Sequence, residues 1–155
     1  MENSNLDRID RAILRALQAD GRISIQDLSA QVGLSPSPCS RRVRLLEERG
    51  VISGYCALID EDKVGFGVSV FVSVKLDKQI DDALRQFEEA IVDCPEVVDC
   101  WLMTGTRDYL LRVATADLAA FEKFLGSRLT RIPGVASIES SIPLRRVKAG
   151  IARAL

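Results

Sequence analysis

The stretch from Ser24 to Tyr55 limits the possible folds of this chain more than any other part of its sequence. It reads as two short helical patterns with Gly33 between them. Glycine readily adopts the left-handed backbone conformation at which a helix stops. Two helices joined by so short a turn are typical of the helix-turn-helix, whose second helix enters the major groove of DNA.

A further helical pattern precedes these two, so the N-terminal part of the chain predicts three helices. Asn5 is the expected N-cap of the first helix, and Ser24 that of the second, where Ser24 and Asp27 resemble a capping box. Apolar residues recur at helical spacing on both helices. Those expected to face the interior are Leu6, Ile9, Ile13, Ala16 and Leu17 on the first helix and Ile25, Leu28 and Val32 on the second.

The third helix is expected to begin at Ser35 as N-cap and to end at Gly50. Pro36 and Pro38 fall in its first turn, where a missing N–H group costs little. The side chains spaced to pack on the other two helices are Cys39, Val43 and Leu46. This packing leaves the polar and basic residues of the third helix on its outer face.

That outer face predicts contact with DNA. Free N–H groups at a helix start favour phosphate, and arginine binds either guanine or phosphate, a choice that the sequence leaves open. Arg42 has a further open role, which is to brace the third helix against the first. The residues expected to contact DNA are Ser35, Ser37, Pro38, Ser40, Arg41, Arg42 and Arg44.

After Tyr55 the apolar residues change from helical spacing to alternation, beginning with a valine-rich strand from Val68 to Leu76. An amphipathic helix, two strands, a second helix capped by Asp117 and a last strand follow. The inward residues of this second helix are expected to be Leu118, Phe121, Leu125, Leu129 and Ile132. The order βαββαβ is that of the ferredoxin-like fold.

The fold class predicted for the whole chain is therefore α+β. A three-helix, winged-helix-like helix-turn-helix domain is followed by a ferredoxin-like domain. The expected divisions are 1–54 for the first domain, 55–65 for a hinge and 66–155 for the second domain. One sheet face would be covered by the two helices, and the other would carry Phe71 and apolar neighbours, which predicts a homodimer.

The net charge of −1 conceals an uneven distribution of charge. Residues 35–46 contain three arginines and no acid, whereas residues 77–99 are rich in Asp and Glu. Local positive charge suits a docked recognition element. No apolar run approaches the ~18 residues of a membrane span, and the polar, acidic N-terminus does not resemble a signal peptide, so a cytoplasmic location is expected.

The chain has four cysteines without a CxxC pair, and it has no histidine. Neither a metal site nor a cofactor is therefore expected. We interpret the cysteines as small buried hydrophobes of a reducing compartment, with a redox switch as the alternative. They are Cys39, Cys56, Cys94 and Cys100.

Several long motifs resemble the leucine-responsive/asparagine regulator (Lrp/AsnC) family, also called feast/famine regulatory proteins. They are LDRIDRAILRALQADGRIS, DLSAQVGLS, RRVRLLEERGVISGY and MTGTRDYLLRV followed by IPGV, and together they extend over nearly the whole chain. The resemblance implies a transcription regulator with an N-terminal helix-turn-helix and a C-terminal effector-sensing domain. It also implies dimers that assemble into tetramers, octamers or larger discs, with an amino acid bound between dimers beside the turn joining the second and third strands.

The resemblance places the effector site at the residues Gly105, Thr106, Arg107, Asp108 and Tyr109, with Ser140 and Ser141 as further polar contacts. Gly105 would let the backbone approach a ligand carboxylate, and Asp108 would bind the α-ammonium. Taken alone, the residues also fit a plain hairpin turn and a solvated carboxylate. Many relatives carry a small or acidic residue in place of Arg107, which could pair with Asp108, contact an acidic effector or close the site.

The sequence argues against two other functions. Some haem-biosynthesis decarboxylases resemble this family in both domains, but they are thought to use histidine, and no nucleophilic residue set or phosphate-binding glycine loop appears here. An enzyme is therefore not expected. A scaffold with an inactive helix-turn-helix is disfavoured by the presence of Arg41 and Arg44, and salt-dependent promoter binding would exclude it.

Overall fold

In the computed structural model the chain divides into two compact units between Leu58 and Ile59. The structure describes residues 6–148, so residues 149–155, the end of the predicted second domain, lie outside it, as does Asn5. The prediction that Asn5 caps the first helix was wrong, because Asp7 occupies the N-cap position of that helix. Within the described part, no helix has both the length and the apolar character that crossing a membrane requires.

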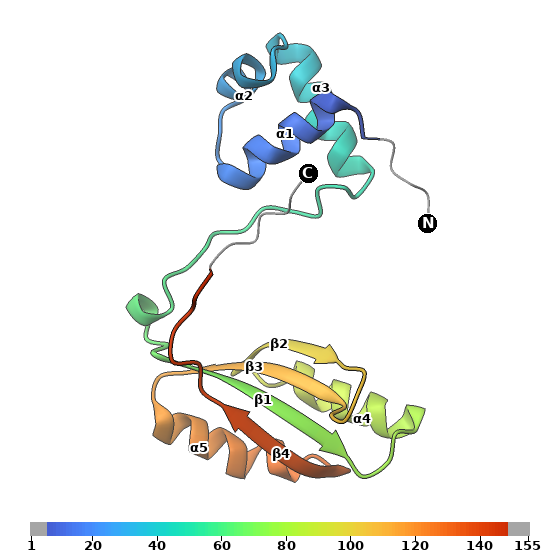
Figure 1. Cartoon of the computed structure of the whole chain (residues 1–155), viewed down its shortest axis with the longest axis vertical. Coiled ribbons are helices and arrows are strands. Elements are labelled where there is room, and N and C mark those ends of the chain that lie inside the picture. Colours follow the sequence, from blue (N-terminus) through green and yellow to red (C-terminus); the bar gives the residue numbers. More distant parts are fainter. Residues whose placement is uncertain (1–5, 149–155) are drawn as a thin grey trace. The chain divides into compact units, whose positions relative to one another are not determined.

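The first unit contains the three predicted helices, α1 (Arg8–Ala19), α2 (Ile25–Val32) and α3 (Pro36–Glu48) (Figure 1). Asp7 is the N-cap of α1. Its carboxylate accepts a hydrogen bond from the Asp10 N–H at 2.8 Å, and the Asp10 carboxylate accepts one from the Asp7 N–H at 3.3 Å. This reciprocal capping box satisfies two backbone donors at the start of α1.

The turn between α2 and α3 forms as predicted. The Ser24 hydroxyl caps α2 by accepting a hydrogen bond from the Asp27 N–H at 3.1 Å, and Gly33 stops the helix at φ 73°. Ile25 was predicted to be buried, but it is 36% exposed. It shares the face of Leu28, yet it is the first residue of α2, where the other helices no longer cover that face. The buried apolar residues of this unit are Ile13, Leu14, Ala16, Leu28, Cys39, Val43 and Leu46.

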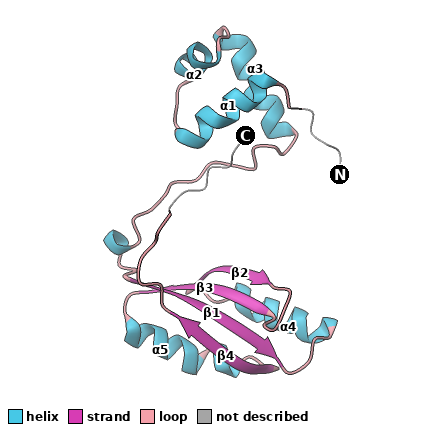
Figure 2. Cartoon of the chain, viewed as in Figure 1, coloured by secondary structure: helices cyan, strands magenta, loops and turns pink. Residues whose placement is uncertain are grey.

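The second unit is a four-stranded antiparallel sheet in the order β2-β3-β1-β4 (Figure 2). This order confirms the ferredoxin-like prediction. The elements are β1 (Val68–Leu76), α4 (Asp81–Val92), β2 (Val97–Leu102), β3 (Tyr109–Thr115), α5 (Leu118–Ser127) and β4 (Val135–Ser141), with short 3-10 turns η1 (Asp62–Val64) and η2 (Leu129–Arg131).

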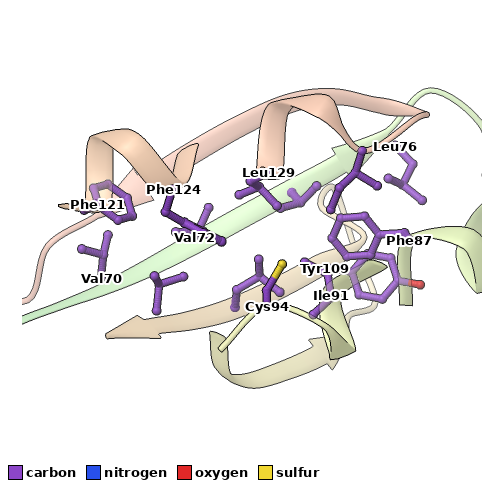
Figure 3. Close-up of a cluster of buried hydrophobic side chains, with 14 residues drawn as sticks. Val70, Val72, Leu76, Phe87, Ile91, Cys94, Tyr109, Phe121, Phe124 and Leu129 are labelled. Carbon is purple, nitrogen blue, oxygen red and sulfur yellow. The ribbon is translucent and has the colours of Figure 1, made fainter. Parts of the chain in front are cut away.

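One face of this sheet packs against α4 and α5 and forms the core shown in Figure 3. Because side chains alternate along a strand, every second residue of β1 and β3 enters it. The rings of Phe87 from α4 and Tyr109 from β3 lie 4.4 Å apart between centroids. The strand residues buried in this core are Val70, Val72, Val74, Leu76, Tyr109, Leu111 and Val113.

Two details of the predicted second unit were wrong. The last helix was expected to continue to Ile132, but α5 ends at Ser127 and a 3-10 turn carries Leu129 into the core. Leu118, expected to face inward, is 56% exposed because it is the first residue of α5. Helical spacing persists briefly through a 3-10 turn, so spacing alone does not locate the end of the α-helix.

The interpretation of the cysteines holds for two of the four. Cys39 and Cys94 are buried, whereas Cys56 in the segment between the units and Cys100 on the edge strand β2 are exposed. Although Cys100 exposes surface, its surroundings are apolar enough that burial, with the nearby Glu88 carboxylate, raises the pKa of its thiol to about 11. That thiol is protonated at neutral pH, which makes it a poor nucleophile.

Candidate DNA interface and effector site

The outer face of α3 presents the basic residues predicted from the sequence. Successive residues of an α-helix are rotated by about 100°, so Ser37, Arg41 and Arg44 point away from the buried side of α3. All three are exposed. Ser35, Pro38 and Ser40 are exposed as well, so six of the seven predicted contact residues are accessible to a DNA duplex.

The start of α3 offers fewer backbone donors than its position suggests. Pro36 and Pro38 have no N–H group, and the Cys39 N–H is bonded to the Ser35 carbonyl at 3.2 Å. The Ser35 side chain makes no capping hydrogen bond. In this first turn only the Ser37 N–H is left to bind a phosphate, so the basic side chains carry most of the attraction for DNA.

Arg42 has a structural task. Its guanidinium donates hydrogen bonds to Asp7 at 2.7 Å and to Asp10 at 2.8 Å, and the Asp10 side chain is only 10% exposed. These carboxylates raise the pKa of Arg42, while the Asp10 N–H and then Arg42 lower the pKa of Asp7. Of the two roles left open by the sequence, the structure shows the brace between α3 and α1.

Arg41 and Arg44 are held far more loosely. Arg44 lies 3.4 Å from the Glu48 carboxylate, and both side chains are more than half exposed, at 68% and 59%. An exposed pair of this kind contributes about 0–1 kcal/mol. Arg41 forms no ion pair with any residue of the range 6–148. Both arginines are therefore free to turn toward a DNA duplex at little cost.

The predicted effector turn joins β2 to β3. Gly105 adopts φ 118°, a conformation that favours glycine, and it is exposed together with Thr106. Asp108 is 2% exposed. Its carboxylate accepts hydrogen bonds from the Leu76 N–H, at 2.7 Å, and from the Gln79 side-chain amide. The Asp108 side chain thereby fastens the turn to the end of β1.

Tyr109 faces the core of the second unit. Its ring is 1% exposed, and its hydroxyl donates a hydrogen bond to the Glu88 carboxylate at 2.8 Å. Burial, and then the bond to Glu88, raises the pKa of this hydroxyl. Tyr109 thus supports the turn from within the fold.

Arg107 pairs across the sheet with β4, donating hydrogen bonds to Ser137 at 2.8 Å and to Glu139 at 2.7 Å. Of the three roles considered for Arg107, its contacts within the chain exclude pairing with Asp108. Sequence reasoning missed Ser137 and Glu139, because only the pairing of β4 beside β1 brings them near the turn. Ser140 and Ser141 lie further along β4, where they pair with Val72 and Phe71 and so point to opposite faces of the sheet.

The sheet face opposite the helices combines apolar and charged groups. Phe71 and Leu110 are half-buried on it, and Trp101 is 44% exposed. Arg112 donates hydrogen bonds to Asp99 and to Glu61, each at 2.9 Å, and both carboxylates raise its pKa. Arg112 therefore ties η1, at the start of this unit, to the open face of the sheet.

The first unit is a helix-turn-helix with exposed arginines, and the second is a sheet unit with an exposed loop. This combination is typical of DNA-binding regulators built from two units. Residues 6–53 match the winged helix-turn-helix DNA-binding family, and residues 69–152 match the Lrp/AsnC ligand binding domain. The chain belongs to the Lrp/AsnC family of transcription regulators, which confirms the resemblance read from its motifs.

Named relatives are similar over almost the full length. The Bkd operon transcriptional regulator of Pseudomonas aeruginosa is 55% identical over 144 residues, covering 93% of this chain and 94% of the relative. The leucine-responsive regulatory protein of Escherichia coli is 44% identical, covering 93% and 88%. The first name describes a transcriptional regulator, and the second describes a regulatory protein that responds to leucine.

Solved structures of the same family superimpose well. A transcriptional regulator of Neisseria meningitidis, determined as its L-methionine complex, aligns with a TM-score of 0.92 and 36% identity over 96% of both chains. A feast or famine regulatory protein of M. tuberculosis, also complexed with L-methionine, aligns with a TM-score of 0.82 and 36% identity over 96% of this chain and 98% of the other.

Proposed function

We propose that this chain is a cytoplasmic, non-enzymatic regulator that binds specific DNA sequences and changes its assembly and DNA binding in response to an amino-acid effector. The observation that carries the proposal is that the arginines of α3 have different roles. Arg42 fixes the helix through two carboxylates, while Arg41 and Arg44 remain exposed and weakly held. Residues 1–54 would form the DNA-binding domain and residues 55–65 the hinge.

The DNA-binding arm is tested by Arg41→Ala and Arg44→Ala in the full chain. Each is expected to weaken binding to the protein's own promoter region, by ~1–3 kcal/mol where the arginine reads a base. Arg85→Ala is the matched control, since Arg85 is an exposed arginine of the second unit that pairs with Asp82. Unchanged affinity in both α3 variants would contradict the assignment of α3 as the recognition helix.

The effector arm places an amino acid beside the β2–β3 turn, with Gly105 and Thr106 as the accessible backbone. Support comes from the L-methionine bound to two structural relatives. Arg107 and Glu139 form an ion pair at 2.7 Å beside the turn. An amino acid that separated them would place its carboxylate on Arg107 and its ammonium on Glu139. Asp108 and Tyr109 would act by holding the turn in place. Of the two serines, Ser141 lies on the same sheet face as Glu139 and would contact an effector that reaches further along β4.

The part of the proposal that concerns assembly rests on the open face of the sheet, which is the face opposite α4 and α5. Phe71, Leu110 and Trp101 form an apolar surface there that a second copy of the chain would cover. Two DNA-binding units related by a two-fold axis match a palindromic site. Effector bound between such dimers would shift the population between tetramers, octamers and larger assemblies, provided that it binds one assembly more tightly.

The effector arm is tested by melting the wild-type protein with each of the twenty amino acids, while sedimentation follows assembly size. A ligand at 100 times its Kd stabilises the native state by about 2.7 kcal/mol. One amino acid that both stabilises the protein and shifts its assembly would identify the effector. If no amino acid stabilises it at millimolar concentrations, the effector arm fails while the DNA-binding arm remains.

A further inference from the structure

A cavity of about 210 Å³ lies within the first unit between α1 and the C-terminal half of α3. A water molecule occupies about 30 Å³ of liquid, so the cavity has ample room for a phosphate group. Its lining comes from one residue of α1, four of α3 and the residue that caps the C-terminal end of α3. These residues are Asp10, Arg41, Arg42, Leu45, Leu46 and Arg49.

The charges in this cavity do not cancel. The Asp10 carboxylate is already engaged by Arg42, which also binds Asp7. The guanidinium groups of Arg41 and Arg49 form no ion pair with any residue in the described range 6–148. Three arginines against the two carboxylates of that ion-pair cluster leave a net positive site, which attracts an anion.

The positions of these residues along α3 match an extended ligand. Arg41, Leu45 and Arg49 follow at intervals of four, so their side chains lie one above another on the same side of the helix. Leu45 is 43% exposed between the two arginines. A free inorganic anion makes no favourable contact with an exposed apolar side chain, whereas the deoxyribose of a nucleotide can pack against one. This order of groups favours a sugar–phosphate backbone.

We propose that this cavity binds a backbone phosphate of DNA through Arg41 and Arg49, with Leu45 against the adjoining sugar. The proposal rests on the DNA binding proposed above and adds Arg49 and Leu45 to the interface. It assigns Arg41 to the backbone and leaves Arg44 to face the bases. The site also supplements the start of α3, where two prolines remove N–H groups that would otherwise bind phosphate.

The experiment measures the affinity of the full chain for its specific duplex and for an unrelated duplex between about 50 and 200 mM salt. Each backbone phosphate contact contributes about −0.9 to the slope of log K against log salt. Arg49→Gln is expected to make the slope less steep by about 0.9 for both duplexes, with the ratio of specific to nonspecific affinity unchanged. Arg49→Lys is expected to keep the slope, because a lysine also neutralises phosphate.

Arg85→Gln, which removes the same charge from the second unit, is the matched control and should leave the slope unchanged. Arg49 is exposed, so its replacement should not disturb the fold, and the thermal midpoints of the variants verify this. If Arg49→Gln leaves the slope unchanged, or lowers affinity for the specific duplex alone, the phosphate site is refuted.

A titration with inorganic phosphate separates the two sources of a phosphate group. If inorganic phosphate at millimolar concentration stabilises the wild type but not Arg49→Gln, while the DNA slopes are equal, the cavity binds a free anion and the proposal fails. If the wild type itself shows no salt-dependent binding to either duplex, the proposed function fails, whatever Arg49 does.

Discussion

At the scale of single residues, three arginines within one turn of α3 have three different surroundings. Arg42 is bonded to two carboxylates, Arg44 forms an exposed ion pair with Glu48, and Arg41 lines a cavity. Their side chains are chemically identical, so the difference arises from the direction in which each leaves the helix. Of the three, Arg42 is the one that forms an ion pair with α1, through the buried Asp10.

The brace formed by Arg42 predicts a specific loss of stability. Arg42→Ala leaves the buried Asp10 carboxylate without its partner, which costs about 1–3 kcal/mol of unfolding free energy. Removing Asp10 as well should cost less than the sum of the two single changes, since the second change removes the unpaired charge. Urea unfolding of the two single variants and the double variant measures this coupling, and strictly additive losses would refute the brace.

The lowered pKa of Asp7 predicts that the stability of the fold depends on pH in the acid range. Its folded pKa lies below the ordinary value of 3.8, so its ionised form stabilises the fold above that pH. The contribution is lost as pH falls through the lower, folded value. Asp7→Asn should therefore lower stability at pH 5 to 7 and flatten the decline below about pH 4. Urea midpoints across this range test it, and parallel curves for both proteins would contradict the assignment.

At the scale of elements, the β2–β3 turn depends on a side chain that the sequence presented as a ligand contact. Asp108 accepts a hydrogen bond from the Leu76 N–H in the buried end of β1. The turn is therefore fastened to β1, while Arg107 links it to β4 through Glu139.

Asp108→Asn is expected to destabilise the second unit by about 1–3 kcal/mol, because the amide is a weaker acceptor for the buried Leu76 N–H. The effector response should be lost with it, while DNA binding by the first unit persists. Asp82→Asn, at a carboxylate 87% exposed, is the matched control and should change neither property. A normal effector response in a stable Asp108→Asn protein would remove Asp108 from the sensing machinery.

Element ends show what periodicity cannot decide. The spacing of apolar residues predicts the strands and helices of both units, because it reflects which face of each element is buried. Ile25 and Leu118 fit that spacing and yet are exposed, since each is the first residue of its helix. Burial at an end depends on how far the neighbouring elements extend, which is a property of the packed fold.

At the scale of the whole molecule, the segment joining the units is tied down at both ends. On the first unit the Tyr55 hydroxyl donates a hydrogen bond to Glu47 at 2.9 Å. On the second, Glu61 accepts one from Arg112 on the open sheet face. Arg112 therefore fixes the start of the second unit to the open face of its sheet.

Phe71→Asp tests whether the open face is a dimer interface. A charge placed in an apolar contact costs several kcal/mol when it is buried unpaired, so sedimentation should show the variant as a smaller species than the wild type. Val92→Asp, at an exposed valine of α4 on the other side of the sheet, is the matched control. If the Phe71 variant remains as large as the wild type, the dimer uses another surface.

The sequence by itself determined the order of elements, the helix-turn-helix, the ferredoxin-like topology and the exposed basic face of α3. It could do so because periodicity, caps and turn glycines are local signals. Only the tertiary structure decided the role of Arg42, the burial of Asp108 and Tyr109, and the pairing of Arg107 with Ser137 and Glu139. Those contacts join residues about thirty positions apart, and a local pattern carries no information on which distant charges the packing of helices and strands will bring together.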